Sequence, residues 1–248
     1  MARRRDKKAK QIEIVMVTDG LGVVSIRGGP TGAVLSITGE PVAADTADFG
    51  GSIGRLVTRH TPWPSDGDPH LVSEWAPVAE WGRMRDWLAG PSPVERLSEP
   101  LAPLLALLEP GEYQLTITEL ARPNVIEVEP GEKRDWYDHP DEWDRDVIVP
   151  THRWPPPAPA TALEYGRRII EGRRPLTVAI RHSQHLGWFL LDGHHKLAAY
   201  LKRQLNPACI AIERLPPHGV RRDELPHWWP SFREIWEAWP TPGGPASA

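Results

Sequence analysis

The stretch Leu190-Leu191-Asp192-Gly193-His194-His195-Lys196-Leu197-Ala198-Ala199 joins two different hydrophobic patterns. The apolar run Trp188–Leu191 predicts a buried strand. Asp192-Gly193 is a turn signal, and the residues after it place Leu197, Ala198 and Leu201 on one face of a helix that we expect from His194 onward. The stretch therefore predicts a strand, a tight turn and a helix in direct succession.

The flanking segments extend this joint into an α+β unit. Residues 160–171 have the apolar spacing of a helix that ends at Gly172. Leu176, Val178 and Ile180 alternate as a strand that we expect to pair with the run at 188–191, and Ala208–Ile212 predicts a third strand. The order helix, strand, strand, helix, strand is the basis for assigning the fold class α+β.

The predicted helix begins with an unusual set of charges. First-turn amides have no intrahelical acceptor and the helix dipole makes this end positive, so acidic side chains are favoured there. Here the turn carries His194, His195 and Lys196, and each positive charge costs about 0.3–1 kcal/mol. A bound phosphate would make the arrangement favourable, and Gly193 would let it approach the backbone. We therefore predict phosphate binding by Gly193, His194, His195 and Lys196.

Two questions at this joint stay open on the sequence alone. Asp192 could cap the helix, orient one imidazole or hold a metal ion bound to the phosphate. The joint could equally be a strand–turn–helix connection whose histidines face solvent and bind nothing.

The string Asp192-Gly193-His194-His195-Lys196, after a strand and before a helix of small residues, resembles the Asp-Gly-His-His-Arg signature of the ParB/sulfiredoxin-like superfamily. The helix over 164–170, the glycine at 172 and the Pro175 that introduces the next strand are similar to the segments that precede the signature there. The resemblance covers residues 147–214. It departs from the signature at Lys196, where the family has arginine, and lysine cannot clamp a phosphate bidentately.

The resemblance implies a nucleotide-phosphate pocket and, with it, Mg²⁺ and ATP or another nucleotide as cofactors. Asp192 and His195 would stand nearest the reacting phosphoryl group, Asp192 would hold the metal, and Glu164 or Glu171 would match the upstream catalytic carboxylate. The chain would then be a phosphotransferase, a phosphohydrolase or a nuclease. The alternative is a binding module without catalysis that recognises nucleic acid or a protein partner.

Charge is unevenly distributed along the chain. The whole chain has 29 basic and 33 acidic side chains and a net charge of −4, which argues against a general nucleic-acid coat protein. Residues 112–146 contain eleven acidic and four basic side chains, whereas residues 147–215 contain ten basic and four acidic ones. Either both are solvated surfaces, or the second segment forms a basic anion site that the acidic segment screens.

We expect four segments. A disordered basic tail spans residues 1–10, and a β-rich unit of unknown role spans 11–146 and begins as an antiparallel meander. Residues 147–215 form the ParB/sulfiredoxin-like domain. Residues 216–248 hold a Trp-rich helix, capped by Ser231, and a tail. Residues 40–75 contain too many Gly, Pro and Asp for long elements, helices are expected around Met84 and Leu104, and a surface loop is expected over 132–146.

Weaker signals remain. His182 and His185 could join His194 and His195 in a zinc site, and Gly50–Arg55 faintly resembles a phosphate loop. A single cysteine, Cys209, suits a reducing cytoplasm, and no apolar run approaches the length of a membrane span. We therefore expect a cytoplasmic protein that does not contact a membrane.

Overall fold

The computed structural model describes residues 11–29, 32–47, 53–58, 78–126, 133–137, 146–150, 158–183 and 187–215. These residues form two β-sheets and four helices, so the fold class is α+β, as the sequence predicts. Among them, no helix is long and apolar enough to cross a membrane. The basic tail at 1–10, the Trp-rich helix at 216–248, His185 and Gly50–Ser52 lie outside the described residues.

The larger sheet has seven strands in the order β1-β6-β12-β10-β11-β9-β7. The three central pairings are mixed: β12 is antiparallel to β6, parallel to β10, and β10 is antiparallel to β11. The strands are β1 (Gln11–Val17), β6 (Gly111–Glu119), β7 (Asn124–Val125), β9 (Val147–Pro150), β10 (Thr177–His182), β11 (Gly187–Asp192) and β12 (Ala208–Leu215). This sheet therefore takes strands from both sides of residue 146.

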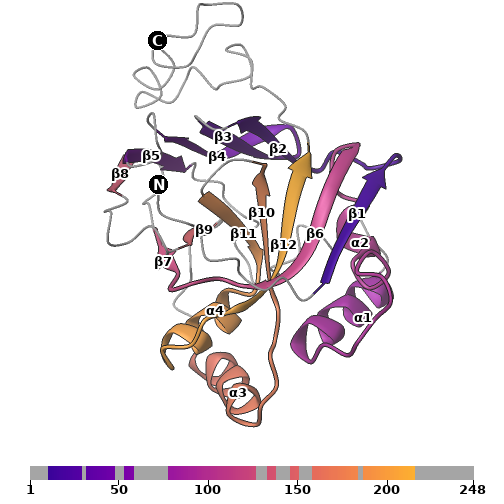
Figure 1. Ribbon diagram of the computed structural model, residues 1–248, viewed down its shortest axis with the longest axis vertical. Coiled ribbons are helices and arrows are strands. Elements are labelled where there is room, and N and C mark those ends of the chain that lie inside the picture. The colour runs from indigo at the N-terminus through magenta and orange to yellow at the C-terminus, as the bar shows by residue number, and fades with distance from the viewer. Residues whose placement is uncertain are drawn as a thin grey trace, which may run out of the picture.

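The smaller sheet has five antiparallel strands in the order β2-β3-β4-β5-β8. Figure 1 shows it lying across one end of the larger sheet. Its strands are β2 (Val24–Gly29), β3 (Gly32–Ile37), β4 (Glu40–Ala47), β5 (Ile53–Thr58) and β8 (Lys133–Tyr137).

Four helices cover the larger sheet at two places. In Figure 1, α1 (Val78–Ala89) and the short α2 (Ala102–Leu105) lie on the side of β1, and α3 (Pro159–Ile170) packs against α4 (His194–Leu201). In Figure 1, α3 and α4 lie at the end of the sheet farthest from the smaller sheet. The strand–turn–helix joint predicted at 188–201 is thus present, and it is placed away from the inter-sheet region.

One apolar core spans both sheets. Its members include Ile26 and Leu35 from the smaller sheet, Ile210 and Ile212 from β12, and Leu88 from α1, all fully buried. A second, smaller cluster on the other face of the larger sheet contains Leu197 of α4 and the fully buried Cys209. The two faces of the larger sheet are therefore both packed near its centre.

Three expectations about the first half of the chain were wrong. β1 does not pair with β2 in a meander but joins β6 in the larger sheet, because its register with Gly111–Ile117 is continuous along all seven residues. Glu40–Ala47 forms an eight-residue strand despite its Pro and Asp residues. Lys133–Tyr137 is a strand rather than a loop, because β5 provides it with an antiparallel partner.

Candidate functional site

The helix start at the centre of the sequence prediction is formed as expected. β11 ends at Asp192, Gly193 is the N-cap residue, and α4 begins at His194. The amide of Leu197 donates to the carbonyl oxygen of Gly193 at 2.8 Å, which closes the first turn. No side chain caps this helix and its first turn contains no acidic residue. The positive end of the dipole therefore has no anionic side chain within the first turn.

Gly193 has a structural reason to be glycine. Its φ of +99° is in the left-handed region that favours glycine, and a Cβ atom added there would lie 3.0 Å from the Cα and Cγ2 atoms of Thr177. Thr177 is the first residue of β10, and its hydroxyl donates to the carbonyl oxygen of Ala208. The missing side chain thus lets the turn pack closely on β10, which is a different reason from the ligand approach inferred from sequence.

Lys196 is buried and makes two polar contacts with the protein itself. Its Nζ atom donates to a carboxylate oxygen of Asp192 at 2.7 Å and to the carbonyl oxygen of Leu176 at 3.0 Å. The side chain of Lys196 is 6% exposed, whereas that of Asp192 is 45% exposed. The ammonium group also lies 5.9 Å from the centre of the Tyr165 ring of α3. Lys196 therefore links β11, the entrance to β10, α4 and α3.

The other predicted site residues do not all lie at this joint. His194 and His195 are partly exposed in the first turn of α4. Glu164 is exposed on α3 and forms an ion pair with Arg168, and Glu171 is exposed at the end of that helix. Among the described residues, no hydrogen bond or ion pair joins either glutamate to Asp192 or His195. The structure thus brings Asp192, Gly193, His194, His195 and Lys196 together and shows no contact that adds a second carboxylate.

The residues at the joint are a poor donor set for a resident divalent cation. Mg²⁺ is held by carboxylates together with substrate phosphates and water. Asp192 is the one carboxylate of the joint, and its contact is the ammonium group of Lys196, which already neutralises it. The described part of the chain contains no group of three or more His, Cys, Asp or Glu side chains placed to hold a metal ion. The residues of the joint therefore do not fit a metal ion held at Asp192.

The described histidines of the suggested zinc site do not lie together, and His185 lies outside the described residues. His182 is fully buried at the last position of β10, and its Nδ1 atom lies 2.7 Å from the carbonyl oxygen of Ser183. Gly193 packs against Thr177 at the first position of the same strand. Five residues of strand separate the two by roughly 16 Å, which is too far for shared coordination with His194 and His195.

Ion pairs engage half of the basic side chains in the segment at 147–215. Arg174 pairs with Glu119 and Arg214 with Glu109, both outside the segment, while Arg181 pairs with Glu213 inside it. Arg168 and Lys196 are also ion-paired. Five of the ten basic side chains are thus committed to carboxylates, and the sequence surplus overstates the positive charge available to a partner.

A pocket lies at the C-terminal end of α4, opposite the end that holds His194 and His195. It has a volume of about 270 Å³ and is lined by Arg122, Pro123, Leu201, Gln204, Leu205 and Asn206. Because these residues follow or face the last turn of α4, the hollow is separate from the joint at Asp192–Lys196.

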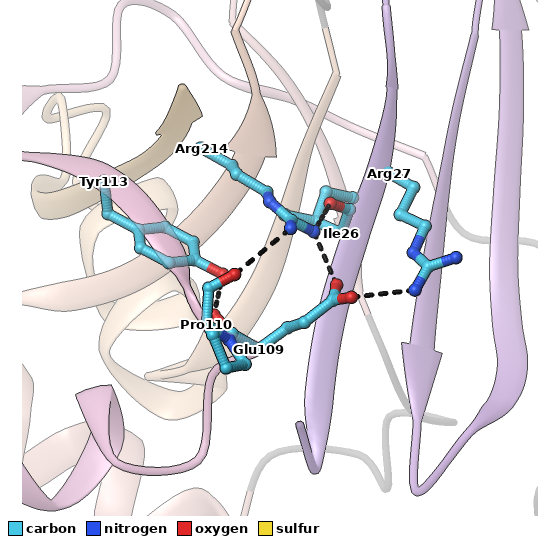
Figure 2. Close-up of polar contacts among 6 residues, drawn as sticks. All are labelled: Ile26, Arg27, Glu109, Pro110, Tyr113 and Arg214. Carbon is cyan, nitrogen blue, oxygen red and sulfur yellow. Dashed lines mark hydrogen bonds and ion pairs between the residues drawn. The ribbon is translucent and has the colours of Figure 1, made fainter. Parts of the chain in front are cut away.

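A second polar cluster, which the sequence did not indicate, ties the two sheets together. Figure 2 shows the carboxylate of Glu109 between Arg27 of β2 and Arg214 of β12. Arg214 Nη1 donates to Glu109 Oε2 at 2.5 Å and to the carbonyl oxygen of Ile26 at 2.9 Å, and Arg27 donates to Glu109 Oε1 at 2.7 Å. The cluster joins residues up to 188 positions apart, so no local pattern could have revealed it.

Burial and charge set the protonation of this cluster. Desolvation by burial would raise the pKa of Glu109, but its hydrogen bonds and charge interactions with Arg27 and Arg214 outweigh it and hold the pKa below the usual value. Burial raises the pKa of Tyr113 to about 12, and its hydroxyl donates to the carbonyl oxygen of Glu109 at 2.7 Å. The cluster is therefore a structural ion-pair network with a neutral tyrosine beside it.

Comparison with known proteins adds no family to these observations. No family model, curated protein or solved structure matches the chain.

Proposed function

We propose that this chain binds the phosphate of a nucleotide, such as ATP, at the N-terminal end of α4. The observation that carries the proposal is an eight-residue helix that follows β11 directly, has neither a side-chain cap nor an acidic residue in its first turn, and presents two partly exposed histidines there. An anion satisfies such a helix end through the backbone amides and the dipole. The resemblance to the ParB/sulfiredoxin-like superfamily at these residues supports the same ligand.

Each residue of the joint has a defined part in this binding. The amides of the first turn donate to phosphate oxygens, and the imidazoles of His194 and His195 add donors beside them. Gly193 holds the turn against Thr177, so the helix start is fixed before a ligand arrives. Lys196 donates hydrogen bonds to Asp192 and to the carbonyl oxygen of Leu176, and these two bonds fix the turn. Binding by this arrangement does not depend on a resident metal ion.

Phosphoryl transfer or hydrolysis is the catalytic form of the proposal. His195 and Asp192 are the side chains that would stand nearest the reacting phosphoryl group, with Glu164 as the upstream carboxylate. A binding module without catalysis is the second candidate, and a specific observation favours it: Asp192 is paired with Lys196 and Glu164 with Arg168, so both acidic groups are already engaged. Such a module would recognise nucleic acid or a protein partner.

The test measures thermal stability of the intact chain with ATP, other nucleoside triphosphates and inorganic phosphate, each with and without Mg²⁺. A ligand at one hundred times its Kd stabilises the folded state by about 2.7 kcal/mol, which is a readily measured rise in Tm. We expect the rise in the native chain and its loss in His195→Ala. Lys202→Ala is the matched control, because Lys202 is an exposed cation just beyond the other end of α4.

Phosphate release in the same samples separates an enzyme from a binder. Release that His195→Ala abolishes supports catalysis, whereas a Tm rise without release supports binding alone. Unchanged Tm with every nucleotide and with phosphate contradicts the proposal. Salt-sensitive binding of DNA in that case supports the non-catalytic module.

A further inference from the structure

The pocket at the C-terminal end of α4 lies between two connections of the chain. Its described lining comes from the connection between β6 and β7, from the last turn of α4 and from the connection between α4 and β12. We call it the α4 pocket, and the described residues that line it are Arg122, Pro123, Leu201, Gln204, Leu205 and Asn206.

Two of these lining residues have a backbone conformation that is unfavourable for their residue type. Arg122 has a φ of +39° and Gln204 a φ of +55°, both in the left-handed region. Among the described residues, Thr38 is the one other non-glycine residue with a positive φ, and it belongs to the two-residue hairpin turn between β3 and β4, where a left-handed residue is usual. Strained residues of this kind cluster at binding sites, where their side chains serve a function. The strain at Arg122 and Gln204 therefore singles out the α4 pocket.

Gln204 stands where a glycine would be more favourable. The amide of Leu205 donates to the carbonyl oxygen of Tyr200 at 3.1 Å, and the amide of Gln204 donates to that of Leu201 at 2.9 Å. These two bonds form a Schellman motif, and Gln204 occupies its left-handed position, which is usually glycine and sometimes asparagine. Stability of the turn thus does not account for a glutamine here, whereas a role of its carboxamide in the pocket does.

The negative end of the helix dipole does not exclude an anion from this pocket. Each of the last carbonyl groups of α4 already accepts a hydrogen bond from the chain, so none is left to repel a ligand. The accepting residues are Ala198, Ala199, Tyr200 and Leu201.

Hydrogen bonds between the two connections hold the pocket open before a ligand arrives. The amide of Arg122 donates to Asn206 Oδ1 at 3.0 Å, and the amide of Leu120 donates to the carbonyl oxygen of Pro207 at 2.9 Å. Arg174 donates to the carbonyl oxygen of Asn206 at 2.9 Å. Because these bonds fix both walls, binding would not require the walls to become ordered.

The lining combines one cation, two carboxamides and an apolar wall. Arg122 is the single charged residue among the described residues of the lining. A guanidinium carries five N–H donors, so Arg122 can bind a carboxylate while it keeps a contact with the protein. Asn206 accepts through Oδ1, which leaves its NH2 group as a donor. Leu201 and Leu205 are 36% and 40% exposed and provide apolar surface beside these donors.

We propose that the α4 pocket binds a small monocarboxylate that carries an apolar group. The carboxylate accepts hydrogen bonds from Arg122, from the NH2 group of Asn206 and from the carboxamide of Gln204, and the apolar group packs on Leu201 and Leu205. A cavity of about 150 Å³ holds benzene, so the volume of about 270 Å³ suits one ring or one branched chain together with a carboxylate.

The first test is a titration of the full-length chain followed by NMR of its backbone amides. The probes are phenylacetate and 4-methylpentanoate, and phenylacetamide is the neutral control of nearly the same shape. We expect saturable shifts at residues 120–124 and 200–207, and a dissociation constant at least about tenfold lower for phenylacetate than for phenylacetamide, since the acid adds a charge-assisted bond. The proposal is overturned if neither acid causes saturable shifts there, if phenylacetamide binds as tightly as phenylacetate, or if inorganic phosphate binds this pocket more tightly than both acids.

The second test uses variants whose backbone tolerates a left-handed conformation. Arg122→Asn removes the cation and should raise the dissociation constant of phenylacetate at least about tenfold. Gln204→Gly relieves the strain, so its Tm should equal or exceed that of the native chain, while the dissociation constant rises about threefold or more because one neutral hydrogen bond is lost.

Thr38→Gly is the matched control, because it relieves the same kind of strain in the smaller sheet, outside the pocket. It should leave phenylacetate binding unchanged. If Gln204→Gly and Thr38→Gly bind phenylacetate equally well, or if Arg122→Asn keeps the native affinity, the assigned binding residues are wrong and the proposal is overturned.

This proposal and the nucleotide proposal stand or fall separately. The two sites lie at opposite ends of an eight-residue helix, roughly 12 Å apart. Arg122→Asn should leave any nucleotide-induced rise in Tm unchanged, and His195→Ala should leave the phenylacetate titration unchanged. Loss of both responses in either variant contradicts two independent sites.

Discussion

At the scale of single residues, the charge of Glu109 stabilises two arginines that lie between the sheets. Its carboxylate forms ion pairs with both Arg214, whose side chain is 6% exposed, and Arg27. Glu109→Gln removes this charge and leaves a buried guanidinium without its counter-ion, so we expect the free energy of unfolding to fall by about 3 kcal/mol. Urea denaturation at neutral pH measures the loss.

Glu119→Gln is the control for that change, because the Glu119–Arg174 pair is 45% and 37% exposed. An exposed pair contributes about 0–1 kcal/mol, so this variant should unfold close to the native chain. If the two variants lose equal stability, burial adds nothing to the contribution of the Glu109 pair.

The same carboxylate makes stability depend on pH in a definite direction. The pKa of Glu109 in the folded state lies below the ordinary value of 4.5, so its contribution is fully present above pH 4.5 and is lost as the pH falls through the lower folded-state value. We expect the stability difference between the native chain and Glu109→Gln to be constant above that pH and to shrink below it. A difference that grows on acidification contradicts this assignment.

Lys196 shows why residue type alone did not indicate its role. A lysine in the first turn of a helix is expected to face solvent, where it could bind a phosphate. The ammonium group of Lys196 instead points inward and donates to Leu176 and Asp192. Lys196→Met leaves the buried carbonyl of Leu176 without its donor, so we expect a loss of about 1–2 kcal/mol. Lys202→Met, at an exposed position, should change the stability by no more than about 0.5 kcal/mol in the same denaturation experiment.

At the scale of elements, the turn between β11 and α4 depends on Gly193. An alanine there meets two costs: a φ of +99° and a Cβ atom 3.0 Å from the backbone of Thr177. Gly172→Ala meets only the first, because its φ is +82° and no atom lies within 4 Å of the added Cβ. We expect Gly172→Ala to lose about 1 kcal/mol and Gly193→Ala clearly more, as measured by Tm and urea midpoint. Equal losses would show that contact with Thr177 is unimportant.

One substitution in the first turn of α4 should change the stability of the ligand-free chain and its nucleotide binding in opposite directions. His195→Glu supplies the acidic first-turn residue that the helix lacks, so we expect the ligand-free chain to gain about 0.3–1 kcal/mol. The same carboxylate repels a phosphate, so the nucleotide-induced rise in Tm should disappear. A variant that gains stability and keeps the nucleotide effect contradicts phosphate binding at this helix end.

The accuracy of the sequence predictions differed between elements for physical reasons. The helices and the strands from Pro159 to Leu215 were predicted correctly because their apolar residues recur at the period of a helix or alternate as in a strand. β1 was predicted as the first strand of a meander, whereas the structure places it at the edge of the larger sheet with Ile12, Ile14 and Met16 exposed. The alternation in the sequence shows which side chains share a face. Which face is buried depends on the hydrogen bonds of Gln11 and Glu13, whose partners lie more than 80 residues away in the sequence.

At the scale of the whole molecule, the two sheets share one core and one ion-pair network. Leu35 of the smaller sheet and Ile212 of the larger sheet belong to the same buried cluster, and Arg214 bonds to the carbonyl oxygen of Ile26 across the gap between the sheets. The sequence placed a soft boundary near residue 146 because composition changes there. Composition cannot show that β1 and β6 lie in the same sheet as β10 and β12, since strand order is set by contacts between distant segments.

Shared packing of this kind predicts that the two sheets unfold together. Native-state hydrogen exchange should give the amides of Leu35 and Ala43 the same opening free energy as those of Ile210 and Ile212, because all four are buried in one cluster. Arg214→Met should then lower both sets by the same amount, since the lost ion pair stabilises both sheets at once. If the smaller sheet instead opens at a free energy lower by about 2 kcal/mol or more, the sheets are separate cooperative units and the Glu109 network is only a surface contact between them.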